Sequence, residues 1–239
     1  MTVMATTRRS GTRRSWTLRS LALAAAALTA VVASAAIPGR ASAHGNIIDA
    51  PSRNFGCWQR WASNFSDPAM QTEDPMCYQA WQASANTMWN WMSLYRNGMA
   101  GAFETAVPDG KLCSMNGAEG GLGNSLDAIG NWTAKDISRD FTLTLHDQAS
   151  HGADFVRVYV TKADYDPTTE PLGWGDLELV TTVGNTPAAQ WTASTTPTNG
   201  VQLKINATAG HSGRAVVFTI WQASHTDQAY FFCSDVNIA

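Results

Sequence analysis

Residue 44 offers unusual metal-binding chemistry if the chain is cut just before it. The segment 41–45 reads Ala-Ser-Ala-His-Gly, and an Ala-x-Ala ending is where signal peptidase cleaves. His44 would then carry a free α-amino group beside its imidazole, so one residue would provide two nitrogen donors. A third nitrogen from a second histidine would complete a T-shaped set. Such a tetragonal nitrogen field suits Cu(II).

The best candidate for that second histidine is His151, in the loop that follows a predicted strand over residues 141–146. In a β-sandwich, the loops at one end lie near the start of the first strand, so His44 and His151 are placed to meet. Their separation in sequence carries no motif specificity, and a coincidental pair is the alternative. His146 is interpreted as a structural residue or a residue behind the ligands, and not as a ligand.

Residues 1–43 have the composition of an export signal. Several arginines and no acidic residue precede an alanine-rich apolar run that is too short for a membrane anchor. The sequence therefore predicts a secreted protein whose mature part, residues 44–239, forms one domain.

The mature chain is acidic. Six of the 16 Lys+Arg precede the cut and all 19 Asp+Glu follow it, which leaves 10 against 19, or −9 with neutral histidines. This balance argues against nucleic acid and anionic membranes as partners and favours a neutral substrate. Ten tryptophans suit stacking on sugar rings, although core packing also uses tryptophan.

Short strands dominate the second half of the sequence. Apolar and polar residues alternate, fully or in part, and turn residues separate the segments 141–146, 155–160, 201–205, 215–221 and 230–238. This pattern predicts an all-β fold, an antiparallel sandwich of immunoglobulin or fibronectin III type. Residues 44–57 read as a short strand that runs into a loop, and one or two short helices are expected between Met76 and Arg96. These helices would form an insertion between the first strands.

Four cysteines in an exported chain predict two disulfides, for which three pairings are possible. We favour Cys57 with Cys77, which closes a local loop. Cys113 with Cys233 would then tie a glycine-rich middle loop to the last strand.

Four stretches together resemble bacterial lytic polysaccharide monooxygenases of auxiliary activity family 10. They are HGNIIDAPSRNFGC after the signal, LHDQASHGADFVRVYVTK, WGDLELV and FTIWQASHTDQAYFFCSDVNI. The likeness spans residues 44–238. It implies one copper ion per chain, held by His44 and His151. It also implies an external electron donor, O2 or H2O2 as co-substrate, and oxidation of a β-1,4-linked polysaccharide at C1 and, as a further option, at C4.

The resemblance also assigns roles around the metal. Ala149 matches a small residue that crowds one axial position, and Tyr230 matches the opposite axial position, where many relatives have Phe. Gln228 matches a polar position aimed at bound oxygen species. The alternatives are that Tyr230 is a core aromatic of the last strand and that Gln228 is a solvated loop residue.

Substrate contact is expected from aromatic residues of the helical insertion. Trp89 and Trp91 cannot share one helical face, and we expect Trp89 to be the exposed one, with Tyr78 as a second contact. Crystalline cellulose is the favoured substrate of a monomeric enzyme, and chitin is the alternative. Met92 stands where the C1/C4-oxidising group has Asn. Two other classes remain open: a non-catalytic polysaccharide-binding protein and a secreted copper carrier.

Overall fold

The computed structural model describes residues 44–99, 101–224 and 226–239. The predicted export signal, residues 1–43, lies outside this part of the chain. Within the described residues, none of the helices has the length and apolar character needed to cross a membrane.

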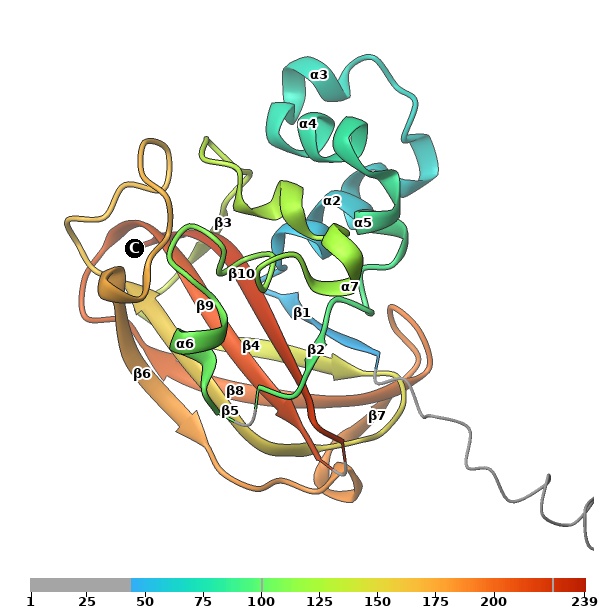
Figure 1. The fold of residues 1–239 in the computed structure, drawn as a ribbon, viewed down its shortest axis with the longest axis vertical. Helices are drawn as coiled ribbons and strands as arrows, with labels where there is room; N and C mark the ends of the chain where they lie inside the picture. The colour runs from blue at the N-terminus through green and yellow to red at the C-terminus, as the bar shows by residue number, and fades with distance from the viewer. Residues whose placement is uncertain (1–43, 100, 225) are drawn as a thin grey trace, which may run out of the picture. The chain divides into compact units, whose positions relative to one another are not determined.

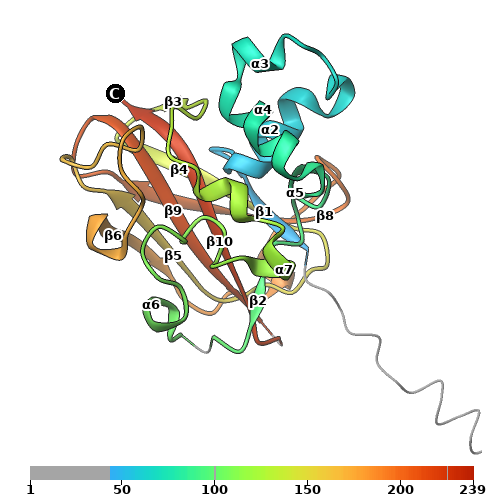
Figure 2. The same cartoon turned by 45° about the horizontal axis from the view of Figure 1, so that its top comes forward.

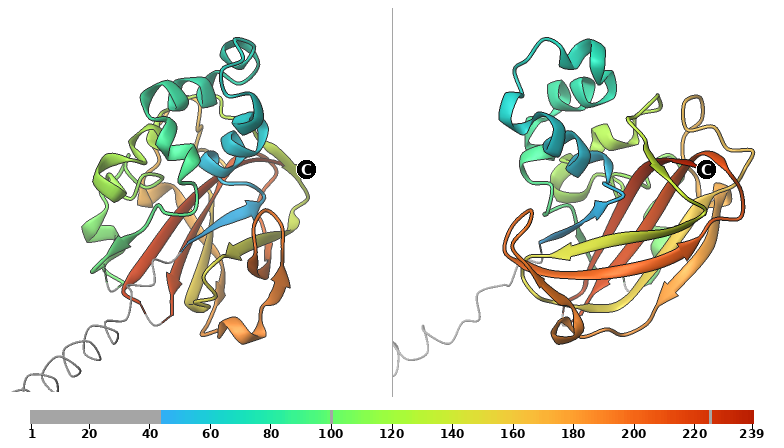
Figure 3. Two further views of the ribbon diagram at one scale, coloured as in Figure 1. Left: turned by 90° about the vertical axis from the view of Figure 1, so that its right-hand side faces the viewer. Right: turned by 180° about the vertical axis from the view of Figure 1, so that it is seen from behind.

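Two β-sheets are stacked on each other, as the views from the front and from behind show (Figures 1 and 3). The first sheet has the strand order β1 (Gly45–Asp49), β4 (Asp140–Asp147), β8 (Gly200–Thr208) and β7 (Thr192–Ser194). The second sheet has the order β2 (Arg96–Asn97), β10 (Gln228–Ile238), β9 (Gly213–Ala223), β5 (Ala153–Thr161) and β6 (Leu177–Val183). β3 (Lys135–Ile137) pairs with β10 in parallel, and all other pairs are antiparallel. The predicted antiparallel sandwich is confirmed.

The central strand β9 is buried on both faces. Val217 and Trp221 face the core between the two sheets, whereas Phe218 and Ile220 face a second core outside the sandwich. That second core is covered by the segment between β2 and β3, which carries the short helices α6 (Phe103–Ala106) and α7 (Ala118–Gly121) (Figure 2). Burial on both faces explains why β9 reads as a nearly continuous apolar run.

The helical insertion lies between β1 and β2. It contains α2 (Arg53–Trp61), α3 (Met70–Glu73), α4 (Pro75–Ala83) and α5 (Ala85–Trp89). Four 3₁₀ turns complete the helical elements of the described residues: η1 (Ala62–Asn64), η2 (Asn124–Asp127), η3 (Trp174–Asp176) and η4 (Ala188–Gln190).

Two of the four helices of the insertion match the expectation from the sequence, and two, α2 and α3, lie before the predicted range. α4 begins with proline, whose fixed φ suits the first helical turn, and α4 and α5 fall where helices are predicted. The sequence predicts a loop up to Cys57, but α2 already begins at Arg53. Phe55 and Cys57 of α2 are buried, so tertiary contacts stabilise a short helix that contains Gly56 and two tryptophans, which favour helix less than Ala or Leu.

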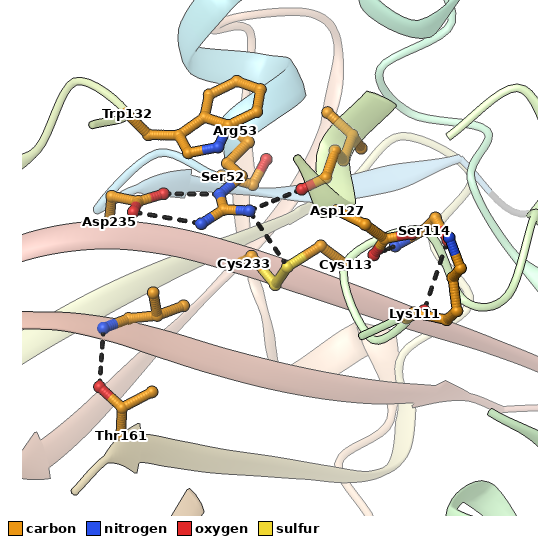
Figure 4. The surroundings of a disulfide bond; sticks show 12 residues. Ser52, Arg53, Lys111, Cys113, Ser114, Asp127, Trp132, Thr161, Cys233 and Asp235 are labelled. Carbon is orange, nitrogen blue, oxygen red and sulfur yellow. Dashed lines mark hydrogen bonds and ion pairs between the residues drawn. A yellow bond between two sulfur atoms is a disulfide. The ribbon is translucent and has the colours of Figure 1, made fainter. Parts of the chain in front are cut away.

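Both favoured disulfides are present. Cys57 pairs with Cys77 and joins α2 to α4, and Cys113 pairs with Cys233 and joins the middle loop to β10. Arg53 lies beside the second disulfide, and Figure 4 shows the residues that Arg53 contacts there. The Cys113–Cys233 disulfide therefore ties the loop that covers the second core to β10. The buried ion pair between Arg53 and Asp235 ties the insertion to the same strand.

Candidate metal site and its surroundings

The first described residues are held against the end of β4. Gly45 pairs with Asp147 in the β1–β4 register, and the carbonyl oxygen of His44 accepts a hydrogen bond from the nitrogen of Gln148 at 2.8 Å. On the other side, the nitrogen of Gly45 donates to the carbonyl oxygen of Met92 at 3.0 Å. These bonds hold the backbone of His44 beside the start of the loop that carries His151.

The carboxylate of Asp147 shapes that loop. It accepts hydrogen bonds from the backbone nitrogens of Ala149 (3.0 Å), His151 and Gly152 (3.0 Å). Its side chain is fully buried. Three N–H donors satisfy a buried carboxylate and fix the path of the loop around it.

The same carboxylate faces the ring of His151. Nδ1 of His151 lies 3.4 Å from Oδ1 of Asp147, and His151 is 8% exposed. A histidine that binds a metal commonly turns its other ring nitrogen to a carboxylate, which fixes the tautomer and the ring orientation. This arrangement leaves Nε2 of His151 for a metal ion.

Trp221 forms the floor beneath both histidine segments. A Cβ atom added at Gly45 would lie 2.6 Å from the Trp221 ring and 2.5 Å from the carbonyl oxygen of His146, so only glycine fits there. Nε1 of Trp221 donates to the carbonyl oxygen of Gly152 at 2.9 Å. Gly152 has a φ of 73°, and a Cβ atom there would lie 2.6 Å from the nitrogen of Ala188. The backbone next to each histidine is thus closely packed.

The structure places the three residues assigned around the metal as follows. Tyr230 is fully buried and stacks on Trp221, with 4.6 Å between ring centroids. Gln228 is 8% exposed at the start of β10, so it is not a solvated loop residue. Ala149 is exposed in the loop that Asp147 shapes. Tyr230 is a core aromatic that also contacts the floor of the site, and the metal-side roles of all three stay predictions.

An exposed aromatic surface lies on the helical insertion, and we define it as Phe65, Trp81 and Trp89. Phe65 is 51% exposed and Trp89 is 44% exposed, while Trp81 is largely buried between them. The ring of Trp89 lies 5.7 Å from each of the other two rings. Trp91 is 3% exposed, so the expected choice between Trp89 and Trp91 is confirmed for exposure. Tyr78 is half-buried and packs on the core rather than on this surface.

The donor set would fit a copper ion after the predicted cleavage before His44. Within the described residues no group of three or more His, Cys, Asp or Glu side chains is arranged to hold a metal. His44 and His151 therefore need a third donor, and the α-amino group that this cleavage would create would supply it. Two imidazoles and an amine form an all-nitrogen donor set. Such a set favours copper over hard cations, which bind oxygen ligands.

The fold and these residues agree with one family. The family model "Lytic polysaccharide mono-oxygenase, cellulose-degrading" matches residues 44–236, and the chain belongs to this family. The solved structure of LPMO10B from Micromonospora aurantiaca is 53% identical in sequence to this chain, with a TM-score of 0.79. The match covers 81% of this chain and 99% of that one. The structure of CelS2, described as a cellulose-active LPMO in complex with copper, is 29% identical with a TM-score of 0.69. It covers 81% of this chain and 98% of that one.

Two curated relatives are longer proteins. A lytic cellulose monooxygenase of Streptomyces ambofaciens is 32% identical over 83% of this chain and 54% of its own length. The chitin-binding protein CbpD of Pseudomonas aeruginosa is 28% identical over 85% of this chain and 49% of its own length. The chain thus spans about half the length of the curated relatives it matches.

Three residues of this region escape sequence reasoning. Asp147 precedes a turn, and an aspartate in that position often accepts hydrogen bonds from nearby backbone nitrogens. The sequence alone does not show that its carboxylate also faces the ring of His151. Trp221 reads as one more apolar residue of a strand. Phe65 lies in a polar stretch, and only its contact with Trp81 and Trp89 reveals it as part of a surface.

Proposed function

We propose that the mature protein is a secreted, monomeric, copper-dependent monooxygenase that cleaves a crystalline β-1,4-linked polysaccharide. The observation that carries the proposal is the convergence of His44 with the Asp147-shaped loop of His151. His44 would hold one copper ion through its amino and ring nitrogens, and His151 through Nε2. Bound copper would supply the redox chemistry, in which an external donor provides electrons and O2 or H2O2 is the oxidant of a sugar carbon.

The protein's own residues would position the reactants. Asp147 would orient the ring of His151, because Oδ1 of its carboxylate lies 3.4 Å from Nδ1 and leaves Nε2 for the metal. Trp221 and Tyr230 exclude water from beneath the site because both are fully buried. Gln228, at the start of β10, would offer a polar group to the oxygen co-substrate, and Ala149 would limit the space beside the metal.

Cellulose is our proposed substrate, with attack at C1 and, as a further option, at C4. Support comes from the family description and from the exposed aromatic surface, on which sugar rings can stack. A chitin-active oxidase is the alternative, because one of the curated relatives is a chitin-binding protein.

The direct test incubates copper-loaded protein that begins at His44 with microcrystalline cellulose and ascorbate. Mass spectrometry should detect oligosaccharides that are heavier by one oxygen atom or lighter by two hydrogen atoms. A matched protein with one alanine ahead of His44 should bind cellulose equally well but release no oxidised product. Release of oxidised products from both proteins would contradict a role for the free amine, and unchanged masses from copper-loaded protein would contradict oxidation of this substrate.

The aromatic surface is tested by a Trp89→Ala variant. Loss of one stacking contact should weaken cellulose binding about tenfold. Stacking of a nucleic-acid base on an aromatic side chain contributes about 1–3 kcal/mol, and we expect a similar contribution from a sugar ring. The melting temperature should stay unchanged because Trp89 is exposed. Phe141→Ala is unsuitable as a control because Phe141 is buried, whereas Leu179→Ala removes an equally exposed apolar group from β6 and should bind like the parent.

A further inference from the structure

The loop that joins β7 to β8 is polar, uncharged and exposed. We call residues 195–199, with the sequence Thr-Thr-Pro-Thr-Asn, the tip loop. Thr195, Thr196 and Asn199 are exposed. The side chains of Thr195 and Asn199 make no hydrogen bond within the part of the chain that the structure describes, so their donors and acceptors are open to a ligand.

Internal hydrogen bonds hold the tip loop in one shape. Oγ of Ser194 donates to the carbonyl oxygen of Thr196 at 2.9 Å and accepts from its nitrogen at 3.2 Å. Nε2 of Gln202 donates to the same carbonyl oxygen at 2.7 Å. A loop that is already ordered loses less conformational entropy when it binds a surface.

The tip loop is also docked on the strand that precedes the candidate metal site. Oγ1 of Thr198 lies 3.0 Å from Nε2 of His146, which is fully buried in β4. At Gly200 an added Cβ atom would lie 2.6 Å from the carbonyl oxygen of Asp147 and 2.8 Å from Cα of Gln148. Because there is no room for a side chain, the hairpin packs directly on the residues that lead to His151.

Met92 connects the tip loop to the aromatic surface. Its carbonyl oxygen accepts the hydrogen bond from Gly45, next to His44, and its sulfur lies 4.0 Å from Oγ1 of Thr198. Trp89, the last residue of α5, precedes Met92 by three positions in the following turn. In Figures 1 and 2 the tip loop and α5 lie on the same side as the first residues of β1.

We propose that the tip loop is a second, polar substrate-binding arm beside the candidate metal site. Thr195 and Asn199 hydrogen-bond the hydroxyl groups of a glucan chain, while Trp89 stacks on sugar rings. The occupant is a neutral, hydroxyl-rich polymer surface, because the exposed groups of the tip are hydroxyls and an amide without charge. Thr198 is a positioning residue that fixes the arm through His146. This inference rests on the proposed function for the location of the reactive centre.

The first experiment compares binding to microcrystalline cellulose for the copper-loaded mature protein and a Thr195→Ala/Asn199→Ala double variant. Loss of two neutral hydrogen bonds should weaken binding about tenfold. A matched control, Thr105→Ala/Thr182→Ala, removes two exposed threonine hydroxyls from α6 and β6 and should bind like the parent. Equal binding by the parent and the tip variant would overturn the arm.

The outcome for the arm is separable from the outcome for the oxidase. Oxidised oligosaccharides from the parent, with equal binding of the tip variant, would retain the oxidase and remove the arm. A tenfold loss of binding in the tip variant, without oxidised products from the parent, would support the arm and overturn the oxidase.

The positioning role of Thr198 has its own test. Thr198→Val removes the hydroxyl that pairs with His146 and should weaken cellulose binding severalfold with unchanged copper affinity. Thr198→Ser keeps the hydroxyl and should restore binding. If Val and Ser variants bind alike, Thr198 does not position the arm. Near-ultraviolet circular dichroism of the Val variant verifies that its packing is native.

Discussion

Two buried carboxylates, Asp235 and Asp147, are satisfied in opposite ways. Asp235 accepts a hydrogen bond from Nε of Arg53 at 2.7 Å (Figure 4). It accepts another from Nη2 of Arg214 at 3.2 Å. Asp147 accepts its bonds from three backbone nitrogens of its own loop and faces the ring of His151. The side chains of both aspartates are almost inaccessible to solvent.

The difference separates a residue that stabilises the fold from one that shapes the site. Arg53 begins α2 and Asp235 lies in β10, so their ion pair joins elements that are 182 residues apart in sequence. Within the described residues, the carboxylate of Asp147 accepts its hydrogen bonds from residues within the next five positions, and His151 is one of them. Disruption at Asp235 should therefore lower stability, whereas disruption at Asp147 should change metal binding.

Arg53→Met should have the largest effect on stability. It leaves the buried carboxylate of Asp235 with only Arg214, and it removes the hydrogen bond to the carbonyl oxygen of Leu126. Breaking a buried pair by removal of one partner costs about 3–5 kcal/mol. Denaturant unfolding measures this loss. A loss below about 1 kcal/mol would show that the ion pair does not hold α2 to β10.

Removal of the neighbouring disulfide should have an effect of similar size. Cys113→Ser/Cys233→Ser opens a loop with a sequence separation of 120, whereas Cys57→Ser/Cys77→Ser opens one of 20. The longer loop should cost about 5 kcal/mol and the shorter one about 3 kcal/mol in the chain-entropy model. Thermal unfolding of both double variants compares them directly. The reverse order would indicate that contacts around each disulfide outweigh chain entropy.

Asp147→Asn should act chiefly on the metal site. An amide can accept fewer hydrogen bonds than a carboxylate and can present a donor to His151, so the loop and the ring lose their fixed orientation. Copper affinity should fall by about tenfold to a hundredfold, as for other second-sphere partners of metal-bound histidines. Isothermal titration with Cu(II) measures this change. Asp140→Asn, an exposed aspartate on the same strand, is the control.

His146→Gln should give the smallest effect on stability, measured as a change in its pH dependence. Burial lowers the pKa of His146, and the nearby charge of Asp147 opposes the shift in part. Because the folded protein binds this proton less readily than the unfolded chain, His146 destabilises the fold as pH falls below the unfolded pKa of about 6.5. The variant should lose less stability than the parent between pH 7 and pH 5. Parallel slopes in thermal unfolding would contradict this.

The strands could be predicted from the sequence because their patterns are local. Apolar residues in segments such as 215–221 need a sheet to bury them, and the turns between segments are marked by Gly, Pro and Asn. α2 could not be predicted, because its residues favour helix only when Arg53 meets Asp235 and Cys57 meets Cys77. The short edge strands β2 and β7 have too few residues for any periodicity.

The candidate site shows the same limit. His44 and His151 could be selected from the cleavage pattern, the loop placement and the family resemblance, and the exposure of Trp89 follows from helical geometry. Asp147 and Trp221 could not be assigned, since their roles depend on which backbone atoms approach them in three dimensions. Phe65 and the tip loop likewise acquire meaning only through contacts between segments that are distant in sequence.

The bonds that hold the start of β1 use the carbonyl oxygen of His44 and the nitrogen of Gly45. The nitrogen of His44 takes no part in them, so its conversion from an amide to an amine leaves this strand pairing intact. Preparations trimmed at slightly different positions should consequently melt alike without copper but take up unequal amounts of it when copper is added. Metal stoichiometry, rather than the thermal stability of the copper-free protein, is then the measurement that reveals incomplete maturation.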